Sequence, residues 1–384
     1  MSSYFTKSGI LMATLFVAFS ASAFSKNIDL QANFSEKTVW DSNPTLLSQD
    51  KKALYGSTTT ASLSAIKKMQ NRRLSTTFSG TRNQFNLSEF NSSDFKGLVG
   101  VSWNSSRWEA SFDGSLNYDT TRTSEITTFG QNIGAVRRTS YLLNPKISYL
   151  TSLRNKIEIS ASVSESRYAS SAFLSDFRTL SLIPSFIYSV SPTQQAILSI
   201  QAQRYQSLEG QAFYIDSIGP SIGWNSSLTP RLTAQLSLGL IGSKTRGDGI
   251  LSQNMVWNDI FSAALLYSNQ KNSLNISATR SRRPFSNGTE SVLTSMSVQD
   301  IYSFNERLSL DTNAKYQFNE LPDNSAGNLD TILSGETTLT YKKSKQWNIT
   351  TSYKYRKQTL TGSDNEAEQN VIRVGLSYKP ISGR

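Results

Sequence analysis

The sequence has no cysteine and no histidine among its 384 residues, and it has few long hydrophobic runs. Without cysteine the chain can form neither a disulfide framework nor a thiol nucleophile. Without histidine it lacks the commonest general base and a common metal ligand. No segment after residue 23 is apolar enough for a membrane-spanning helix, which needs about 20 residues. P-loop, zinc and calcium-loop motifs are also missing, so we expect no cofactor, no metal site and no nucleic-acid partner.

Strict alternation of apolar and polar residues is the main pattern that is present. In the segment Ser227–Ser243, Leu232, Ala234, Leu236, Leu238 and Leu240 share one parity, and polar residues occupy the other. Such alternation predicts a strand with one apolar and one polar face. The same pattern recurs at Trp108–Tyr118, Ile157–Val163, Leu308–Phe318 and Trp347–Tyr355. Strands this long suit a tilted membrane crossing, which needs about 9–11 residues.

Connections between these segments alternate between short turns and long polar loops. Roughly forty residues separate successive short turns, which is the period of a hairpin with short periplasmic turns and long extracellular loops. Thr229-Pro230-Arg231 is predicted to be one of these periplasmic turns. We therefore predict an all-β fold, a transmembrane antiparallel β-barrel of about eighteen strands. Sixteen strands remain the alternative, if the segment Ile28–Val39 lies outside the barrel.

The N-terminal segment predicts export. Residues 1–23 combine a basic Lys7, an apolar run from Ile10 to Phe19 and a small-residue cleavage site at Ala21-Ser22-Ala23. This arrangement is typical of a secretory signal peptide. We expect residues 1–23 to be the signal peptide and residues 24–384 to form the barrel, in the bacterial outer membrane.

Aromatic residues of the apolar parity stand beside nearly every short turn. Amphipathic rings collect where hydrocarbon meets water, so we predict a periplasmic aromatic girdle. Its members are Trp103, Trp108, Tyr149, Tyr188, Trp224, Tyr267, Phe304, Tyr341, Trp347 and Tyr378.

The polar parity predicts the lining of a water-filled lumen, in which basic side chains outnumber acidic ones about two to one. The predicted pore-lining basic residues are Arg73, Lys96, Arg107, Lys146, Arg231, Lys315, Lys342, Lys354, Arg356 and Arg373. The predicted acidic residues of the lumen are Glu109, Asp113, Glu158, Asp311 and Glu336. An excess of positive charge in a low-dielectric wall concentrates anions. Pairing of these charges across strands is the alternative, since the register is unknown at this point.

Two further basic regions fall near the predicted extracellular end. The loop Thr120–Val136 is the longest, and it carries Arg122 and Glu125, with Arg137 and Arg138 beside it. This loop either folds inward as a constriction or stays on the surface. Arg280, Arg282 and Arg283 form a second cluster that suits anionic lipopolysaccharide or an acidic glycan, unless it is simply solvated.

In the predicted final strand, Val371–Tyr378, apolar and polar residues alternate. This pattern resembles the C-terminal signal that the barrel-assembly machinery recognises. Six further residues, Lys379–Arg384, follow the aromatic residue on which such barrels usually end. We therefore expect the assembly machinery as a partner, together with outer-membrane lipid and lipopolysaccharide.

Several phrases spread over the chain resemble a family of outer-membrane β-barrel porins whose members frequently lie in exopolysaccharide or surface-polysaccharide loci. They are "DSNP" at Asp41–Pro44, "TTRTSE" at Thr120–Glu125 with Gly130, "NPKISYLTS" at Asn144–Ser152, "RSRRPFSNG" at Arg280–Gly288 and "SFNERLSL" at Ser303–Leu310. The resemblance implies a role in moving glycan across the outer membrane, with polysaccharide-export components as partners. It brings no catalytic residues.

Together these observations predict a passive porin or export channel for anionic solutes or surface polysaccharide. The alternative is a non-conducting scaffold or receptor barrel. An enzyme is disfavoured, because outer-membrane phospholipases, omptin-type proteases and lipid A deacylases use a catalytic histidine that this chain lacks.

Overall fold

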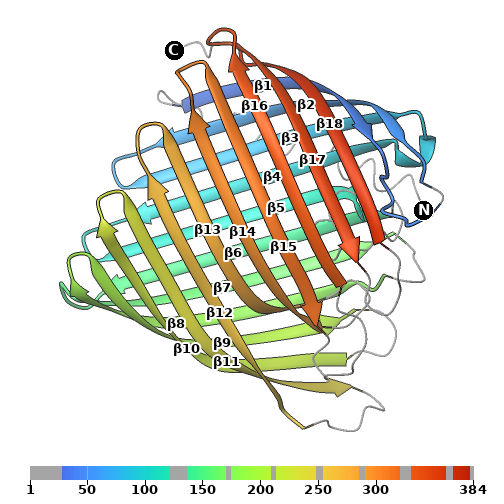
Figure 1. Cartoon of the computed structure of the whole chain (residues 1–384). Coiled ribbons are helices and arrows are strands. Elements are labelled where there is room, and N and C mark those ends of the chain that lie inside the picture. Colours follow the sequence, from blue (N-terminus) through green and yellow to red (C-terminus); the bar gives the residue numbers. More distant parts are fainter. Residues whose placement is uncertain are drawn as a thin grey trace.

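The computed structural model forms a closed barrel of eighteen antiparallel strands, in which each strand pairs with its neighbours in sequence (Figure 1). The structure describes residues 28–49, 51–121, 136–169, 174–208, 213–247, 254–284, 290–320, 330–359 and 366–380. The strands are β1 Ile28–Asp41, β2 Leu54–Lys68, β3 Arg72–Phe85, β4 Ser92–Asn104, β5 Trp108–Thr120, β6 Arg137–Leu150, β7 Asn155–Tyr168, β8 Phe177–Ser191, β9 Gln194–Ser207, β10 Phe213–Thr229, β11 Leu232–Gly247, β12 Val256–Ser268, β13 Asn272–Pro284, β14 Glu290–Ser303, β15 Leu308–Glu320, β16 Asp330–Lys342, β17 Trp347–Thr359 and β18 Glu366–Tyr378.

Pairing of the first and last strands closes the barrel and decides the strand count. β1 pairs with β18 from Phe34↔Tyr378 to Asp41↔Val371, and with β2 along its whole length. The segment Ile28–Val39 therefore belongs to the barrel, which confirms eighteen strands rather than sixteen. Because every strand has two partners, no sheet edge is left unpaired.

Short turns lie at one end of the barrel and longer connections at the other, as the sequence predicts. Side chains within the turns satisfy their backbone N–H groups: Asn269 accepts from the N–H groups of Lys271 and Asn272 at 2.8 and 2.7 Å. The turn at Pro230 and Arg231 joins β10 to β11 in the predicted place. β18 begins at Glu366, five residues before the predicted Val371, because its pairing with β17 continues to Thr359↔Glu366.

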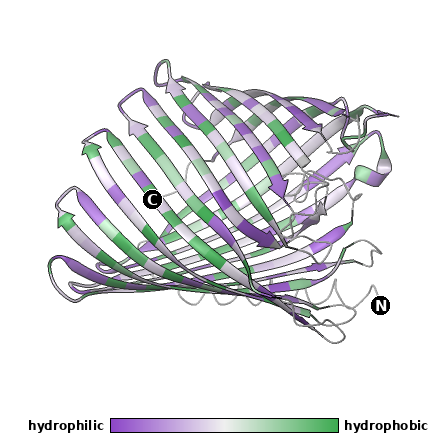
Figure 2. Ribbon diagram, turned by 60° about the horizontal axis from the view of Figure 1, so that its bottom comes forward, coloured by the Kyte–Doolittle hydropathy of each residue, from purple (hydrophilic) through white to green (hydrophobic). Residues whose placement is uncertain are grey.

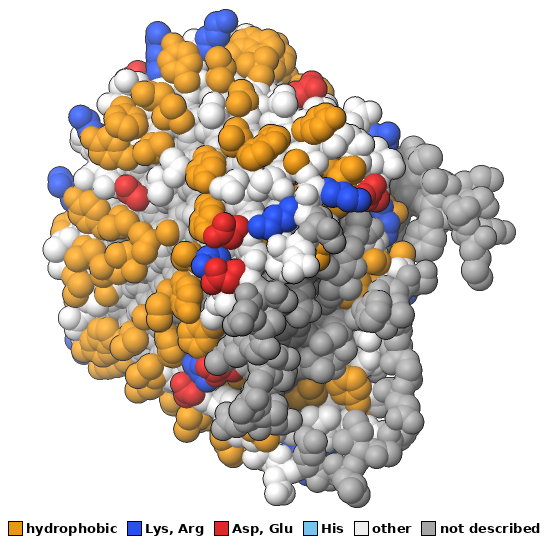
Figure 3. Space-filling model, turned by 45° about the vertical axis from the view of Figure 1, so that its right-hand side comes forward, with side chains coloured by type: hydrophobic (Ala, Val, Ile, Leu, Met, Phe, Trp, Pro, Cys, Tyr) orange, Lys and Arg blue, Asp and Glu red, His pale blue; other side chains and the backbone are white. Residues whose placement is uncertain are grey.

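The outer surface carries the apolar residues. Large hydrophobic side chains are exposed on every strand, for example Phe78 at 43%, Leu238 at 51% and Ile222 at 63%. Hydrophobic and hydrophilic residues alternate along the ribbons in Figure 2. Hydrophobic side chains cover much of the strand surface in Figure 3, and charged ones gather where the strands meet the loops. A soluble protein would bury such a surface, so the barrel is built to face lipid.

Helical structure is minor in the described part of the chain. One 3-10 turn, Ser88–Phe90, lies between β3 and β4. Among the described residues no helix has the length and hydrophobicity needed to span a membrane.

Candidate functional site: the inner wall of the barrel

The inner face of each strand is the face opposite its exposed hydrophobic residues. On β17, for instance, Trp347, Ile349 and Tyr353 are exposed, so the even-numbered residues face inward. Cross-strand hydroxyl pairs support the assignment elsewhere: Ser185 with Ser199 at 2.9 Å and Ser277 with Ser297 at 2.8 Å both lie on inward positions.

Eight of the ten predicted pore-lining basic residues occupy inward strand positions. They are Arg73, Lys96, Lys146, Lys315, Lys342, Lys354, Arg356 and Arg373. Arg107 and Arg231 lie in short turns just before β5 and β11, where strand alternation no longer fixes the direction of a side chain. That these ten residues line a conducting pore stays a prediction.

On the wall of β5–β7, two lysines and two glutamates form a balanced group, and Asp113 also faces inward there. Lys146 lies 2.9 Å from Glu158, and Lys156 lies 3.5 Å from both Glu158 and Glu109. Ser148 donates a further hydrogen bond to Glu109 at 3.3 Å. The cations and carboxylates of this group cancel, so it adds little net charge to the lumen.

The wall of β15–β18 is different, because basic groups outnumber their carboxylate. Arg373 and Lys354 share Glu336, at 3.0 and 3.9 Å. Lys315 and Arg356 stand near them on the same wall, and the charge of Arg356 acts on Lys315. Lys354, Arg356 and Arg373 thus gather around one carboxylate, Glu336. Lys315 lies on β15, which also carries the inward Asp311. On β1, which continues this wall, Lys37 and Asp41 also face inward. Neither is among the lumen charges predicted from the sequence.

Arg356 is buried in this wall. Arg356 is only 5% exposed, and the neighbouring Gln358 and Gln369 are 4% and 5% exposed. Among the described residues no carboxylate lies within ion-pair distance of it, and its Nε has no hydrogen-bond acceptor. The negative charge of Asp41 acts on Arg356. The Asp41 carboxylate itself accepts hydrogen bonds from the Gln369 side chain at 3.0 and 2.9 Å and from the Asn43 N–H at 3.0 Å.

The wall of β8–β14 is almost uncharged. On the inward positions that the structure describes in these strands, the only charged side chain is Arg283, near the end of β13. Short polar side chains take the other places, including Ser181, Ser199, Gln201, Gln203, Ser221, Asn225, Gln235, Ser237, Ser262, Asn275 and Ser297. One side of the lumen is therefore cationic and the other is neutral and hydrogen-bonding.

Two hollows mark the inner wall between β3 and β8. One, of about 240 Å³, is lined by Asp113, Lys146, Ser160 and Ile183 among others, and one, of about 360 Å³, by Ser75, Gly100, Asp113 and Asn144 among others. Small residues make room here: a Cβ on Gly100 would lie 2.8 Å from the Ser75 hydroxyl oxygen. At the loop end of the barrel, five buried residues form a hydrophobic cluster: Tyr168, Leu174, Phe177, Tyr205 and Ile215.

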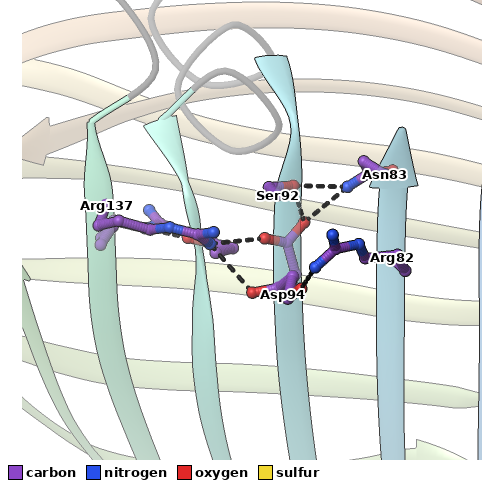
Figure 4. Close-up of polar contacts among 8 residues, drawn as sticks. Arg82, Asn83, Ser92, Asp94 and Arg137 are labelled. Carbon is purple, nitrogen blue, oxygen red and sulfur yellow. Dashed lines mark hydrogen bonds and ion pairs between the residues drawn. The ribbon is translucent and has the colours of Figure 1, made fainter. Parts of the chain in front are cut away.

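Arg137 and Arg138, which we predicted beside the longest loop, begin β6 and make long-range contacts. Arg138 pairs with Asp119 on β5 at 3.0 Å. Arg137 crosses the end of β5 to reach Asp94 on β4 at 2.9 Å (Figure 4). Its guanidinium lies over the Tyr118 ring. Asp94 in turn accepts from Asn83 at 3.0 Å. Arg122 and Glu125, the other constriction candidates, lie outside the described residues.

The outer face near the loops carries arginines that share carboxylates. Glu165 accepts from Arg167 at 2.6 Å and from Arg178 at 2.7 Å. Asp216 lies 2.6 Å from Arg204 and 3.7 Å from Arg246. Strand alternation also splits the predicted arginine cluster of β13: Arg280 and Arg282 face outward, whereas Arg283 faces inward.

Predicted girdle residues stand beside the short turns at the opposite end. The rings of Trp108 and Tyr149 lie 4.4 Å apart, and those of Trp347 and Tyr378 lie 4.7 Å apart. Trp103, Trp224 and Tyr341 are about two-fifths exposed on the outer face. Apolar strands with charged groups toward the loops and aromatic rings at the turns form the pattern of an outer-membrane barrel.

No metal-binding group is evident in the described part of the chain, where no three carboxylates come together. The polar and charged inner wall described above is the candidate site.

Comparison with known proteins gives likeness of fold only. No family model and no curated protein matches the chain. The chain is similar to the iron transporter FrpB of Neisseria meningitidis (F5-1 variant, apoprotein form), at 8% identity over 91% of this chain and 81% of that chain, with a TM-score of 0.49. It is also similar to OccK2 (OpdF) of Pseudomonas aeruginosa in complex with glucuronate, at 10% identity over 92% of this chain and 99% of that chain, with a TM-score of 0.48. OccK11 (OpdR) of the same organism gives 10% identity over 91% and 96%, with a TM-score of 0.45.

Proposed function

We propose that this barrel is a passive outer-membrane channel that favours small anionic solutes. The observation that carries the proposal is the uneven inner wall, with three cations around Glu336 on β15–β18 and a neutral wall of short polar side chains on β8–β14. Eighteen strands enclose more space than their inward side chains fill, which leaves room for a solute path.

Electrostatics gives this wall its selectivity. A surplus of fixed positive charge in a low-dielectric wall raises the local concentration of anions and lowers that of cations. The facing hydroxyl and amide groups replace part of a solute's hydration without adding charge. A small anion that carries hydroxyl groups fits both walls, whereas a cation is repelled by one of them.

Lipid and partner contacts extend the proposal. The outward arginines of β7–β11 stand at the loop end, where lipopolysaccharide phosphates would meet them. Contact with the barrel-assembly machinery through β18, and a role with polysaccharide-export components, stay predictions from the sequence.

Reconstitution of residues 24–384 in a planar bilayer tests the proposal. We expect steady single-channel conductance and a reversal potential in a salt gradient that shows anion preference. A folded barrel that conducts no ions would instead support a scaffold or receptor.

A further inference from the structure

Arg356 poses a physical problem that its protein neighbours do not solve. An ionised side chain taken out of water is costly unless hydrogen bonds and an opposite charge compensate it. Arg356 is 5% exposed, and its Nε lacks an acceptor. Since an arginine stays protonated in proteins, the cost cannot be removed by loss of the proton.

Other charges on this wall add to the problem. Lys354 and Arg356 lie on successive inward positions of β17, and Arg373 faces inward on β18. Glu336 is already shared between Arg373 and Lys354. The Asp41 carboxylate is held by the Gln369 side chain and the Asn43 backbone, and both of its oxygens already accept hydrogen bonds.

The segment that follows β1 packs against this part of the wall. Asn43 donates to the carbonyl oxygens of Leu47 and Glu368 at 2.8 and 2.9 Å, and Leu46 packs against Ala367 of β18. Leu46 has a φ of 51°, a conformation that a leucine rarely adopts, so these contacts hold the segment in a defined shape. Arg356 of β17 pairs in register with Gln369 of β18, the residue that binds Asp41 at the start of this segment.

We propose that Arg356, with Lys354 and Arg373 beside it, forms an oxyanion-binding site on the lumen wall, for a solute bearing a carboxylate or a phosphate. The proposal deepens the proposed channel function and rests on it. A planar guanidinium binds the two oxygens of such a group in parallel, and the two neighbouring cations add attraction without a fixed geometry. An anion bound here supplies the acceptor that the Arg356 Nε lacks, and it adds to the partial counter-charge that Asp41 and Glu336 provide. An anionic solute would then bind transiently at this site on its way through the barrel.

Calorimetric titration of the refolded full barrel in detergent, in a low-chloride buffer at neutral pH, tests the site. The probes are inorganic phosphate and acetate, in separate titrations, which distinguish the two oxyanion classes. We expect saturable binding of at least one probe by the wild type. The variant Arg356→Gln should weaken it on the order of tenfold or more, as for the loss of a charge-assisted hydrogen bond. Arg356→Lys should retain part of the affinity.

The matched control is Lys146→Gln, which removes an inward cation from the balanced wall of β5–β7 and should leave binding unchanged. Circular dichroism of each variant checks folding, and Arg356→Lys serves if Arg356→Gln does not fold. Absence of binding of both probes to the folded wild type overturns the site, as does equal binding by wild type and Arg356→Gln. Because calorimetry needs no conduction, a barrel that binds without conducting keeps the site and overturns the channel, and one that conducts without binding does the reverse.

Discussion

Two parts of the inner wall contain the same types of charged residue but differ in their charge balance. On β5–β7, two lysines and two glutamates pair at 2.9 to 3.5 Å and cancel. On β15–β18, Lys354, Arg356 and Arg373 surround a single Glu336. The number of lumen charges is thus a poor guide to the field in the lumen. What matters is whether the register brings each cation to its own carboxylate.

Removal of the cationic surplus should have the largest effect. In the triple variant Lys354→Gln, Arg356→Gln and Arg373→Gln, the described inward charges left on the β15–β18 wall are Lys315, Lys342, Asp311 and Glu336, which balance. We expect the anion-to-cation permeability ratio to fall about fivefold or more, on the order of 1 kcal/mol for loss of solvated charge interactions. The reversal potential in a salt gradient measures it. An unchanged ratio would show that this wall does not face the solute path.

Removal of the shared carboxylate should act in the opposite direction. Glu336→Gln leaves Lys354 and Arg373 without their common partner and increases the surplus. We expect a higher anion preference, by a factor of about two to three, since water screens part of one charge. The same reversal-potential measurement checks it. A shift toward cations would contradict the inward placement of this group.

Salt concentration should reduce the difference between the two walls. The Debye length falls from about 30 Å at 0.01 M to about 3 Å at 1 M, so fixed charges act on solutes over a shorter distance. We expect the anion preference of the wild type to decline steadily over this range. Selectivity that is independent of salt would point to a narrow steric or coordinating filter instead.

Disruption of the balanced wall should have the smallest effect. Lys146→Gln leaves Lys156 to share Glu109 and Glu158, and the local net charge becomes negative by one. We expect a slight decrease in anion preference, below that of any variant on β15–β18. An effect as large as that of the triple variant would mean that the two walls do not differ as described.

Most of the fold could be predicted from the sequence because alternation is a local property. The apolar parity around Leu232–Leu240 and the turn at Pro230 required only neighbouring residues, and both strand and turn are confirmed. Alternation also placed Lys354, Arg356 and Arg373 on one face. It does not extend into turns, which is why Arg107 and Arg231 could not be assigned a face in the same way.

The charge balance could not be predicted, because it depends on contacts between distant segments. Arg137 meets Asp94, 43 residues away in the sequence, across the intervening end of β5. Asp41 begins a polar stretch that alternation does not assign to a strand, yet it ends β1 and contacts Gln369, 328 residues away. Burial of Arg356 likewise could not be predicted, because alternation gives the face on which a residue lies but not its exposure.

The most direct test of the account is the reversal potential of the wild-type barrel, residues 24–384, in a planar bilayer across a potassium chloride gradient. The surplus of inward cations on β15–β18 predicts a potential of the sign that chloride preference gives. A potential of the opposite sign, or none across the gradient, would contradict the central claim that this surplus faces the solute path.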